Sequence, residues 1–246
     1  MQHLLRKQII SCIILMVVFC TGLQAQRYEI YRTQHDDMPY YFGLTLGYNS
    51  CYLSPTKSKT FLMSDSVKVA EPGSSGGISL GLHGTLRLSR RFQLRFNPQL
   101  VLGGARYFSY TINPDYAKPG EPTSQTKTMP TTEWNFPLQI KFNSDRIGNF
   151  RTYLLFGGKY DINVVSSDGS ATTFNNDWLL KLKKNDFGLE IGVGFNFFLE
   201  YFTLSPEIKF GYGLTNVLDR DPNLKYSSVF DKLQSRILMF SLHFED

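Results

Sequence analysis

Two consecutive runs of alternating hydrophobicity constrain the fold of this chain more than any other feature. Apolar residues occupy every second position from Phe187 to Leu199, and again from Phe202 to Leu214. Glycines and charged residues fill most of the positions between them. A period of two over such long runs indicates β-strands, because successive side chains of a strand point to opposite faces. We therefore expect an antiparallel hairpin with one apolar face and one face of small and charged residues.

The first 25 residues have the layout of a secretory signal peptide. Arg6 and Lys7 precede an apolar run from Ile9 to Phe19, and the small residue Ala25 offers a cleavage site. The apolar run is too short for a membrane-spanning helix. We therefore expect three segments: a signal peptide (1–25) cleaved after Ala25, a flexible periplasmic lead-in (26–39) and a folded domain (40–246).

Export of the chain limits its chemistry. Removal of the leader takes away Cys12 and Cys20 and leaves Cys51 as the single cysteine, which excludes an internal disulfide. Loss of two basic residues leaves 24 basic and 21 acidic residues, a net charge of +3 that is too mild to indicate a nucleic-acid partner. Because no later stretch is apolar for long enough to form a spanning helix, any membrane-spanning form must be a β-barrel.

The alternation recurs along the rest of the domain and predicts eight strands. The expected strands cover residues 41–52, 78–88, 92–102, 134–142, 151–164, 187–199, 202–214 and 238–244. The second, fourth and sixth links are short, whereas four links are long: 54–77, 107–131, 166–184 and 218–231. Short turns at one end and long loops at the other are typical of a bacterial outer-membrane barrel. The predicted fold class is all-β: an eight-stranded antiparallel transmembrane β-barrel of the outer membrane, with periplasmic turns and external loops.

Alternation alone does not say which face points inward, because a soluble eight-stranded barrel of the lipocalin type has the same period with its apolar face inside. Three features favour the membrane barrel, whose apolar face contacts outer-membrane lipids. Aromatic residues gather near the strand ends, and the last strand ends in Phe244. The opposite face carries small residues and charges of both signs, which can pair in a narrow lumen: Arg87, Arg95, Lys141, Glu190, Glu207 and Lys209.

The charged face of the hairpin allows a prediction of register. If Leu199 faces Phe202, then Gly192 faces Lys209, and Lys209 lies diagonally from Glu190. One interpretation of these charges is a polar conduit. The other is structural filling, which we favour because eight strands leave room only for side chains.

Residues suited to catalysis or metal binding are few. The three histidines of the mature chain, His35, His83 and His243, have no metal-ligand spacing, and no nucleophile motif accompanies them. A lipid-modifying barrel would need a hydroxyl, an imidazole and an acid at the external rim or on the lipid face, and neither strand histidine has that placement. We expect no enzymatic activity, no metal or other cofactor and no small-molecule substrate.

Four further residues raise questions of local structure. Cys51 falls on the inward face of the first strand, where the simplest interpretation is an inert buried thiol. Pro98, Pro137 and Pro206 fall inside predicted strands, where each removes a donor from the hydrogen-bond ladder. We therefore expect bulges or strand ends at the three prolines.

Five sequence blocks carry a resemblance to a known family. The longer blocks are LRFNPQLVLGGARYFSY (94–110), WNFPLQIKFNSDRIGNFRTYLLFGGKYDI (134–162) and LSPEIKFGYGLTNV (204–217). The opening YYFGLTLGYNS (40–50) and the closing LQSRILMFSLHFE (233–245) fit as well. In order and content these blocks resemble the PorT family (PorT/SprT) of outer-membrane β-barrels in Bacteroidota, and the likeness covers nearly all of the mature chain.

The resemblance implies a role in the type IX secretion system, which exports cargo proteins with C-terminal signal domains to the cell surface. PorT-like proteins resemble accessory or assembly components that contact other members of the system, and no catalytic or cofactor residue can be carried over. The family block Gly213, Leu214, Thr215 and Asn216 is expected at the mouth of an external loop. The alternative is an outer-membrane barrel with an independent ligand-binding or lipid-modifying role.

Overall fold

The computed structural model describes residues 29–57, 67–104, 106–112, 124–129, 131–164, 182–219 and 230–246. The chain divides into two compact units, residues 1–31 and 32–246, and the fold below is that of the second unit. The expected signal peptide lies outside the described residues. The elements are η1 (Thr33–Asp36), β1 (Tyr40–Lys57), β2 (Val67–Arg87), β3 (Phe92–Phe96), β4 (Gln99–Gly103), β5 (Arg106–Ile112), β6 (Ser124–Met129), β7 (Thr132–Asn143), β8 (Phe150–Asn163), β9 (Asn185–Phe198), β10 (Thr203–Gly213) and β11 (Phe230–Glu245).

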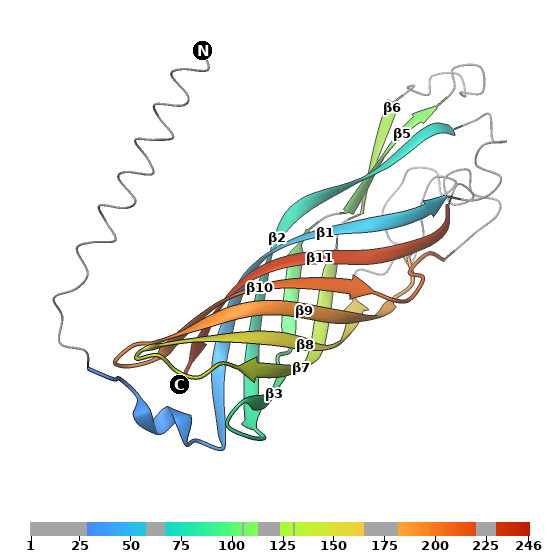
Figure 1. Cartoon of the computed structure of the whole chain (residues 1–246). Helices are drawn as coiled ribbons and strands as arrows, with labels where there is room; N and C mark the ends of the chain where they lie inside the picture. The colour runs from blue at the N-terminus through green and yellow to red at the C-terminus, as the bar shows by residue number, and fades with distance from the viewer. Residues whose placement is uncertain are drawn as a thin grey trace, which may run out of the picture. The chain divides into compact units, whose positions relative to one another are not determined.

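The strands close into an antiparallel ring (Figure 1). β1 pairs with β11 on one side and with β2 on the other, and the ring continues through β10, β9, β8 and β7. β3 and β4 lie end to end and together occupy one position between β2 and β7. The prediction of an eight-stranded antiparallel barrel is therefore confirmed.

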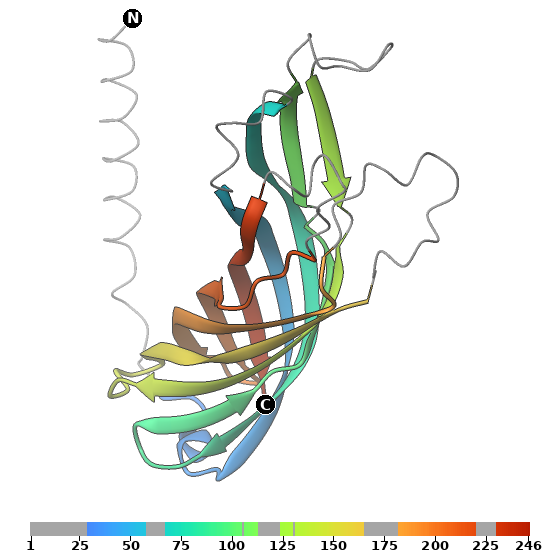
Figure 2. The ribbon, with the colours of Figure 1, turned by 90° about the vertical axis from the view of Figure 1, so that its right-hand side faces the viewer.

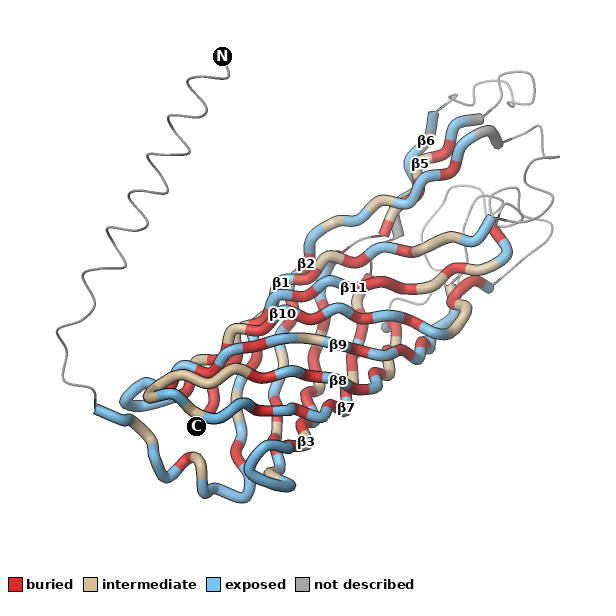
Figure 3. The backbone as a smooth tube through the Cα atoms, in the orientation of Figure 1, coloured by how far each residue is buried: buried red, intermediate tan, exposed pale blue. Residues whose placement is uncertain are grey.

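The two faces of each strand have opposite environments, as the alternating colours of Figure 3 show. The outward face is apolar and open, with Phe42 65% and Leu82 62% exposed, whereas the inward Arg95 and Lys141 are fully buried. This arrangement reverses that of a soluble protein, whose charged side chains face water. It is the arrangement of a transmembrane barrel, and it excludes the lipocalin-like alternative with its apolar face inside. None of the helices within the described ranges is long and apolar enough to cross a membrane.

Three compact turns join strands at one end of the barrel, which we call the short-turn end. In the turn after β2, the Ser89 hydroxyl accepts hydrogen bonds from the amides of Arg91 and Phe92. The turn after β9 is closed by the Leu199 amide, which donates to the Phe202 carbonyl at 3.0 Å. This turn sets the register of the hairpin, so Gly192 faces Lys209 as predicted.

The opposite end, which we call the long-loop end, differs from the sequence prediction. The segments 54–77 and 107–131, predicted as long polar loops, contain the end of β1, the first half of β2, and the hairpin of β5 and β6. β5 pairs with β2 and β6 pairs with β5, forming a three-stranded sheet that projects beyond the ring (Figure 2). The segments form strands because their apolar residues are buried together: Phe108 and Tyr110 pack on Phe230, at the start of β11.

The three prolines coincide with gaps in the hydrogen-bond ladders. Pro98 separates β3 from β4, and Pro137 faces the same interruption from β7. Across this gap the Asn97 amide donates to the Pro137 carbonyl at 3.3 Å. Pro206 lies in a gap of the β9–β10 pairing, between the pairs formed by Leu204 and Glu207. At Pro137 and Pro206 the strand loses local pairs on one side while its other ladder continues. At Pro98 the pairing is interrupted on both sides, towards β2 and towards β7.

Part of the expected flexible lead-in is folded at the short-turn end. Residues of η1 form a 3-10 turn, in which the ring of His35 is buried and lies 4.6 Å from that of Tyr41 and 5.8 Å from that of Phe198. The Asp36 carboxylate pairs with Arg146 at 3.0 Å. This part of the segment is ordered because its polar residues find partners on the barrel turns and strands.

Candidate functional site

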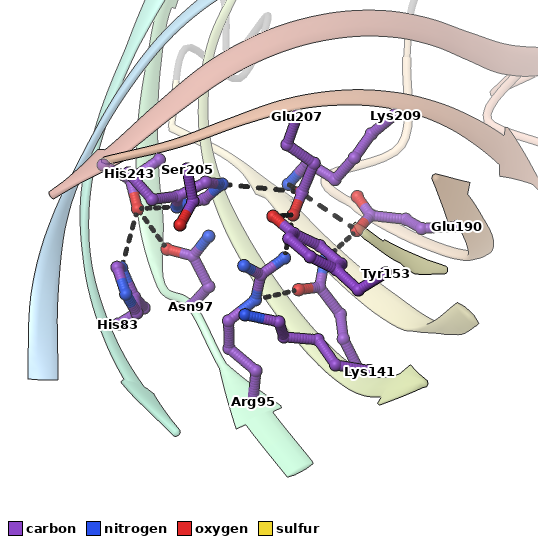
Figure 4. Close-up of polar contacts among 12 residues, drawn as sticks. His83, Arg95, Asn97, Lys141, Tyr153, Glu190, Ser205, Glu207, Lys209 and His243 are labelled. Atoms are coloured by element: carbon purple, nitrogen blue, oxygen red, sulfur yellow. Dashed lines mark hydrogen bonds and ion pairs between the residues drawn. The ribbon is translucent and has the colours of Figure 1, made fainter. Parts of the chain in front are cut away.

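A network of buried polar and charged side chains lies inside the ring, and Figure 4 shows many of its members. Its members come from both halves of the ring, and each is at most 5% exposed. We call this set the lumen network: Thr45, His83, Arg95, Asn97, Gln139, Lys141, Tyr153, Glu190, Glu207, Lys209, His243 and Glu245. All lie on the face opposite the apolar one, so the alternation of each strand places them inside.

Glu207 of β10 is the centre of the lumen network. Its Oε2 atom lies 2.5 Å from Nη2 of Arg95 and accepts a hydrogen bond from the Tyr153 hydroxyl at 2.7 Å. Its Oε1 atom lies 3.9 Å from Nζ of Lys209 and 3.5 Å from Nε2 of His243. The two contacts of Oε2 are short hydrogen bonds to an ionised group, which are the strong kind and compensate for the loss of water around the carboxylate. The two contacts of Oε1 are longer and lie outside hydrogen-bond distance.

Glu190 of β9 joins the same network through Gln139. The Gln139 amide donates to Glu190 at 2.6 Å, and its carbonyl oxygen accepts from Nε of Arg95 at 2.9 Å. Nζ of Lys209 lies 4.0 Å from Glu190, in the diagonal relation that the register gives. Lys209 therefore bridges the two carboxylates of the hairpin.

Glu245 of β11 is the third carboxylate of the network and contacts Lys141 and His83. Its Oε1 atom lies 3.5 Å from Nζ of Lys141 and 3.5 Å from Nε2 of His83. Nζ of Lys141 also lies 4.1 Å from the centre of the Tyr153 ring, a cation–π contact. Three carboxylates thus face three basic side chains, Arg95, Lys141 and Lys209, in the lumen network.

The six charges predicted for the lumen do not all meet. Five belong to the lumen network, but Arg87 lies at the short-turn end, where its guanidinium donates to the His35 carbonyl at 2.8 Å. Glu245 and the two histidines were not predicted as members. Their inward positions follow from the same alternation, but their partners lie on strands distant in sequence.

A second group of charges lies towards the long-loop end. Arg106 of β5 lies 2.8 Å from Glu133 of β7, Lys159 of β8 pairs with Asp161, and both pairs are buried. None of these four residues was predicted as a site. We call this group the upper cluster.

Apolar side chains fill the lumen beside and beyond the upper cluster. One set of buried residues is Cys51, Val101, Ile237 and Met239. A larger set at the long-loop end is Leu53, Ala70, Phe108, Tyr110, Val217, Leu218, Phe230 and Leu233. A water-filled channel would leave the charges along its path exposed. Because the lumen network is enclosed, the described part of the barrel has no open conduit through that network.

The block from Gly213 to Asn216 ties the end of β10 to its neighbours. The Thr215 hydroxyl donates to Asp186 of β9 and accepts from the Phe187 amide at 3.2 Å. The Asn216 side-chain oxygen accepts from the amides of Leu218, at 3.1 Å, and Leu233, at 3.0 Å. A Cβ at Gly213 would lie 2.2 Å from the Ser235 hydroxyl oxygen, so a larger residue there would displace the Ser235 side chain. The block therefore anchors the chain where it leaves the barrel at the long-loop end.

One group in the lumen has the components of a nucleophile–base–acid relay. The Thr45 hydroxyl lies 3.1 Å from Nδ1 of His83 and 2.9 Å from Nδ1 of His243. The other ring nitrogen, Nε2, faces Glu245 in His83 and Glu207 in His243. Unlike a catalytic relay, this one lies among side chains that are all at most 2% exposed. In this conformation the Thr45 hydroxyl is enclosed by its neighbours in the lumen. Within the described residues no cluster of His, Cys, Asp and Glu could hold a metal ion.

An apolar outer face, a filled polar lumen and a closed antiparallel ring define the class of this protein as a small outer-membrane β-barrel. A family model described as "Outer membrane protein beta-barrel domain" matches residues 25–219, and the chain belongs to that family. No curated protein sequence matches the chain.

Several solved structures are similar to the fold. The outer membrane protein OprG from Pseudomonas aeruginosa is 14% identical, with 82% of this chain and 94% of that chain covered and a TM-score of 0.41. AlkL in lipid bilayers is 11% identical, with 91% and 94% covered and a TM-score of 0.44. The outer membrane protease OmpT from Escherichia coli is 12% identical, with 84% and 95% covered and a TM-score of 0.44. Similarity at this level carries no functional conclusion.

Proposed function

We propose that this protein is an outer-membrane component of a type IX protein secretion system, needed for the export of cargo proteins to the cell surface. It acts as an accessory or assembly factor through contacts with other components of the system. It is neither the translocation pore nor an enzyme. The observation that carries this proposal is the filled lumen, combined with the resemblance of the sequence blocks to the PorT family.

The filled lumen supports action by contact and not by transport. Arg95 and Glu207 meet across the interior at 2.5 Å, and Lys141 reaches Glu245 from the opposite wall. Opening a passage would separate these buried ion pairs and leave each charge without its partner, which is strongly unfavourable. The surfaces left for function are those outside the lumen.

The three-stranded sheet of β2, β5 and β6 supports a contact at the long-loop end. β6 forms one edge of this sheet, and among the described residues its outer side has no hydrogen-bonded neighbour. A free edge presents a row of backbone donors and acceptors that an extended segment of a partner protein can extend by one strand. The blocks 94–110 and 204–217 of the family resemblance cover β4, most of β5, most of β10 and the link that follows β10.

Deletion of the gene tests the role in secretion. We expect type IX cargo to be lost from the cell surface and restored when the wild-type chain is supplied in trans. Intact delivery of cargo, together with altered lipid A or envelope permeability, would instead favour the alternative of a ligand-binding or lipid-modifying barrel.

The anchored block after β10 offers a finer test. Thr215→Ala combined with Asn216→Ala removes the hydrogen bonds that hold this block to β9 and β11, and we expect reduced delivery of cargo at normal barrel levels. The amount of folded barrel in the membrane is measured by heat-modifiable mobility on gels. Arg91→Gln, at the short-turn end, is the matched control. Normal export by the double variant would argue against a role for the block.

A further inference from the structure

An apolar groove of about 380 Å³ lies on the lipid-facing surface near the short-turn end. The groove extends from β2 across β1 and β11 to the turn before β10, so the β1–β11 pairing that closes the ring lies beneath it. Its lining residues are Phe42, Gly43, Leu44, Leu82, Phe202, Phe244, Glu245 and Asp246. Of these only Glu245, whose side chain is buried, also belongs to the lumen network.

The groove follows from the register of the strands. Leu82 of β2 pairs with Leu44 of β1, and Leu44 pairs with Phe244 of β11, so the three side chains form one row on the outer face. Phe202, just before β10, extends the row, with its ring centre 5.9 Å from that of Phe244. Phe42, one outward position nearer the turns, borders the groove. The row is a continuous hydrocarbon surface across neighbouring strands.

A charged group borders this apolar row. The Asp246 side chain is fully exposed, and its carboxylate lies 3.5 Å from the Arg32 guanidinium. The Asp246 amide donates to the Phe42 carbonyl at 3.1 Å, and Arg32 also donates to the Glu245 carbonyl at 3.1 Å. These bonds fix a carboxylate at the strand ends, the level at which polar headgroups lie in a bilayer.

We propose that the groove is a binding site for one phospholipid with a primary amine headgroup. One acyl chain lies along the row formed by Leu82, Leu44 and Phe244, and the amine contacts the Asp246 carboxylate. With the short turns on the periplasmic side, as in bacterial barrels of this class, the site faces the phospholipid leaflet.

Two matched variants on β1 test the acyl-chain site. Leu44 lines the groove, whereas Leu46, the next outward residue on the same strand, is exposed to a similar degree and lies outside it. The proteins are incubated with equal amounts of phosphatidylethanolamine and phosphatidylglycerol of identical chains, and bound lipid is counted by native mass spectrometry. Wild type and Leu46→Trp should retain one phospholipid. Leu44→Trp should retain about tenfold less, the equivalent of displacing about two methylene groups.

The same experiment tests whether the Asp246 carboxylate selects a lipid with an amine headgroup, because it compares the binding of two lipids. Wild type should prefer phosphatidylethanolamine, and Asp246→Asn should lower that preference while keeping a bound lipid. Heat-modifiable mobility verifies that every variant is folded. Equal retention by the two tryptophan variants, or no retained lipid on wild type, overturns the site. Equal binding of the two lipids by wild type overturns the role of Asp246.

Discussion

Two arginine–carboxylate pairs in this barrel have similar chemistry and opposite surroundings. Arg95 and Glu207 meet at 2.5 Å with both side chains fully buried, whereas Arg91 and Asp145 meet at 3.1 Å with side chains 58% and 82% exposed. Water can replace either partner of the exposed pair at little cost. It cannot replace either partner of the buried pair, because each charge is surrounded by protein. The lumen therefore consists of mutually dependent groups, whereas the short turns tolerate substitution.

The largest expected effect is that of breaking the buried pair. Arg95→Met leaves Glu207 without its guanidinium, and we expect the free energy of unfolding to fall by about 3–5 kcal/mol. Urea titration followed by tryptophan fluorescence and gel mobility measures the change. The double variant Arg95→Met with Glu207→Leu should recover part of the loss. A single-variant loss below about 1 kcal/mol would mean that the lumen network rearranges freely.

His35 lies at the boundary between the two regions, and its docking should depend on pH. Burial lowers the pKa of His35 from 6.5 to about 4, so the docked imidazole is neutral. Because the undocked residue binds a proton below pH 6.5, docking is stable at neutral pH and weakens as the pH falls from 6.5 to 4. The full loss is about 3 kcal/mol.

A spin label at Gln34 reports this docking. We expect its mobility to increase between pH 6.5 and 4, and His35→Phe, which keeps the contacts with Tyr41 and Phe198, should remove the dependence. A mobility that stays constant in wild type over this range would exclude His35 as the group that responds.

A smaller effect is expected at the long-loop end. Asn216→Ala removes two bonds to backbone amides, those of Leu218 and Leu233, at a cost of about 1–2 kcal/mol. Hydrogen exchange at these two amides should accelerate while exchange in the β7–β8 pairing stays unchanged. Gln234→Ala, which removes weaker 3.3 Å bonds to Gly213 and Leu214, is the matched control. Equal acceleration by both variants would show that Asn216 has no special anchoring role.

The smallest effect is expected for the exposed pair. Arg91→Gln should change the free energy of unfolding by less than about 1 kcal/mol. High salt should reduce even this difference, since it screens exposed charges. A loss as large as that of Arg95→Met would abolish the contrast between the two pairs.

The sequence predicts the ring well, because alternation defines both faces of each strand. It also predicts the relation between Lys209 and Glu190, because a single short turn fixes their register. Glu245 was missed as a lumen partner, since its contacts with Lys141 and His83 depend on how the ring closes and not on local pattern.

The hairpin of β5 and β6 was also missed, for a different reason. The buried face of β5 combines Phe108 and Tyr110 with Arg106, and its other face combines Tyr107 with Ser109 and Thr111, so neither face has a uniform character. The hairpin acquires its apolar partner only when β11 brings Phe230 against it. Pairing of this kind, between segments more than a hundred residues apart, is not visible in a local period.

β2 connects the membrane part of the protein mechanically to the sheet beyond it. At about 3.3 Å per residue, its 21 residues form a continuous strand of roughly 70 Å. Its first half pairs with β5 and its second half with β1. A pull on the projecting sheet along β2 therefore loads the β1–β2 hydrogen bonds in shear, all at once, and not one after another. Such a connection would transmit a force applied to the projecting sheet into the barrel wall without peeling the wall apart.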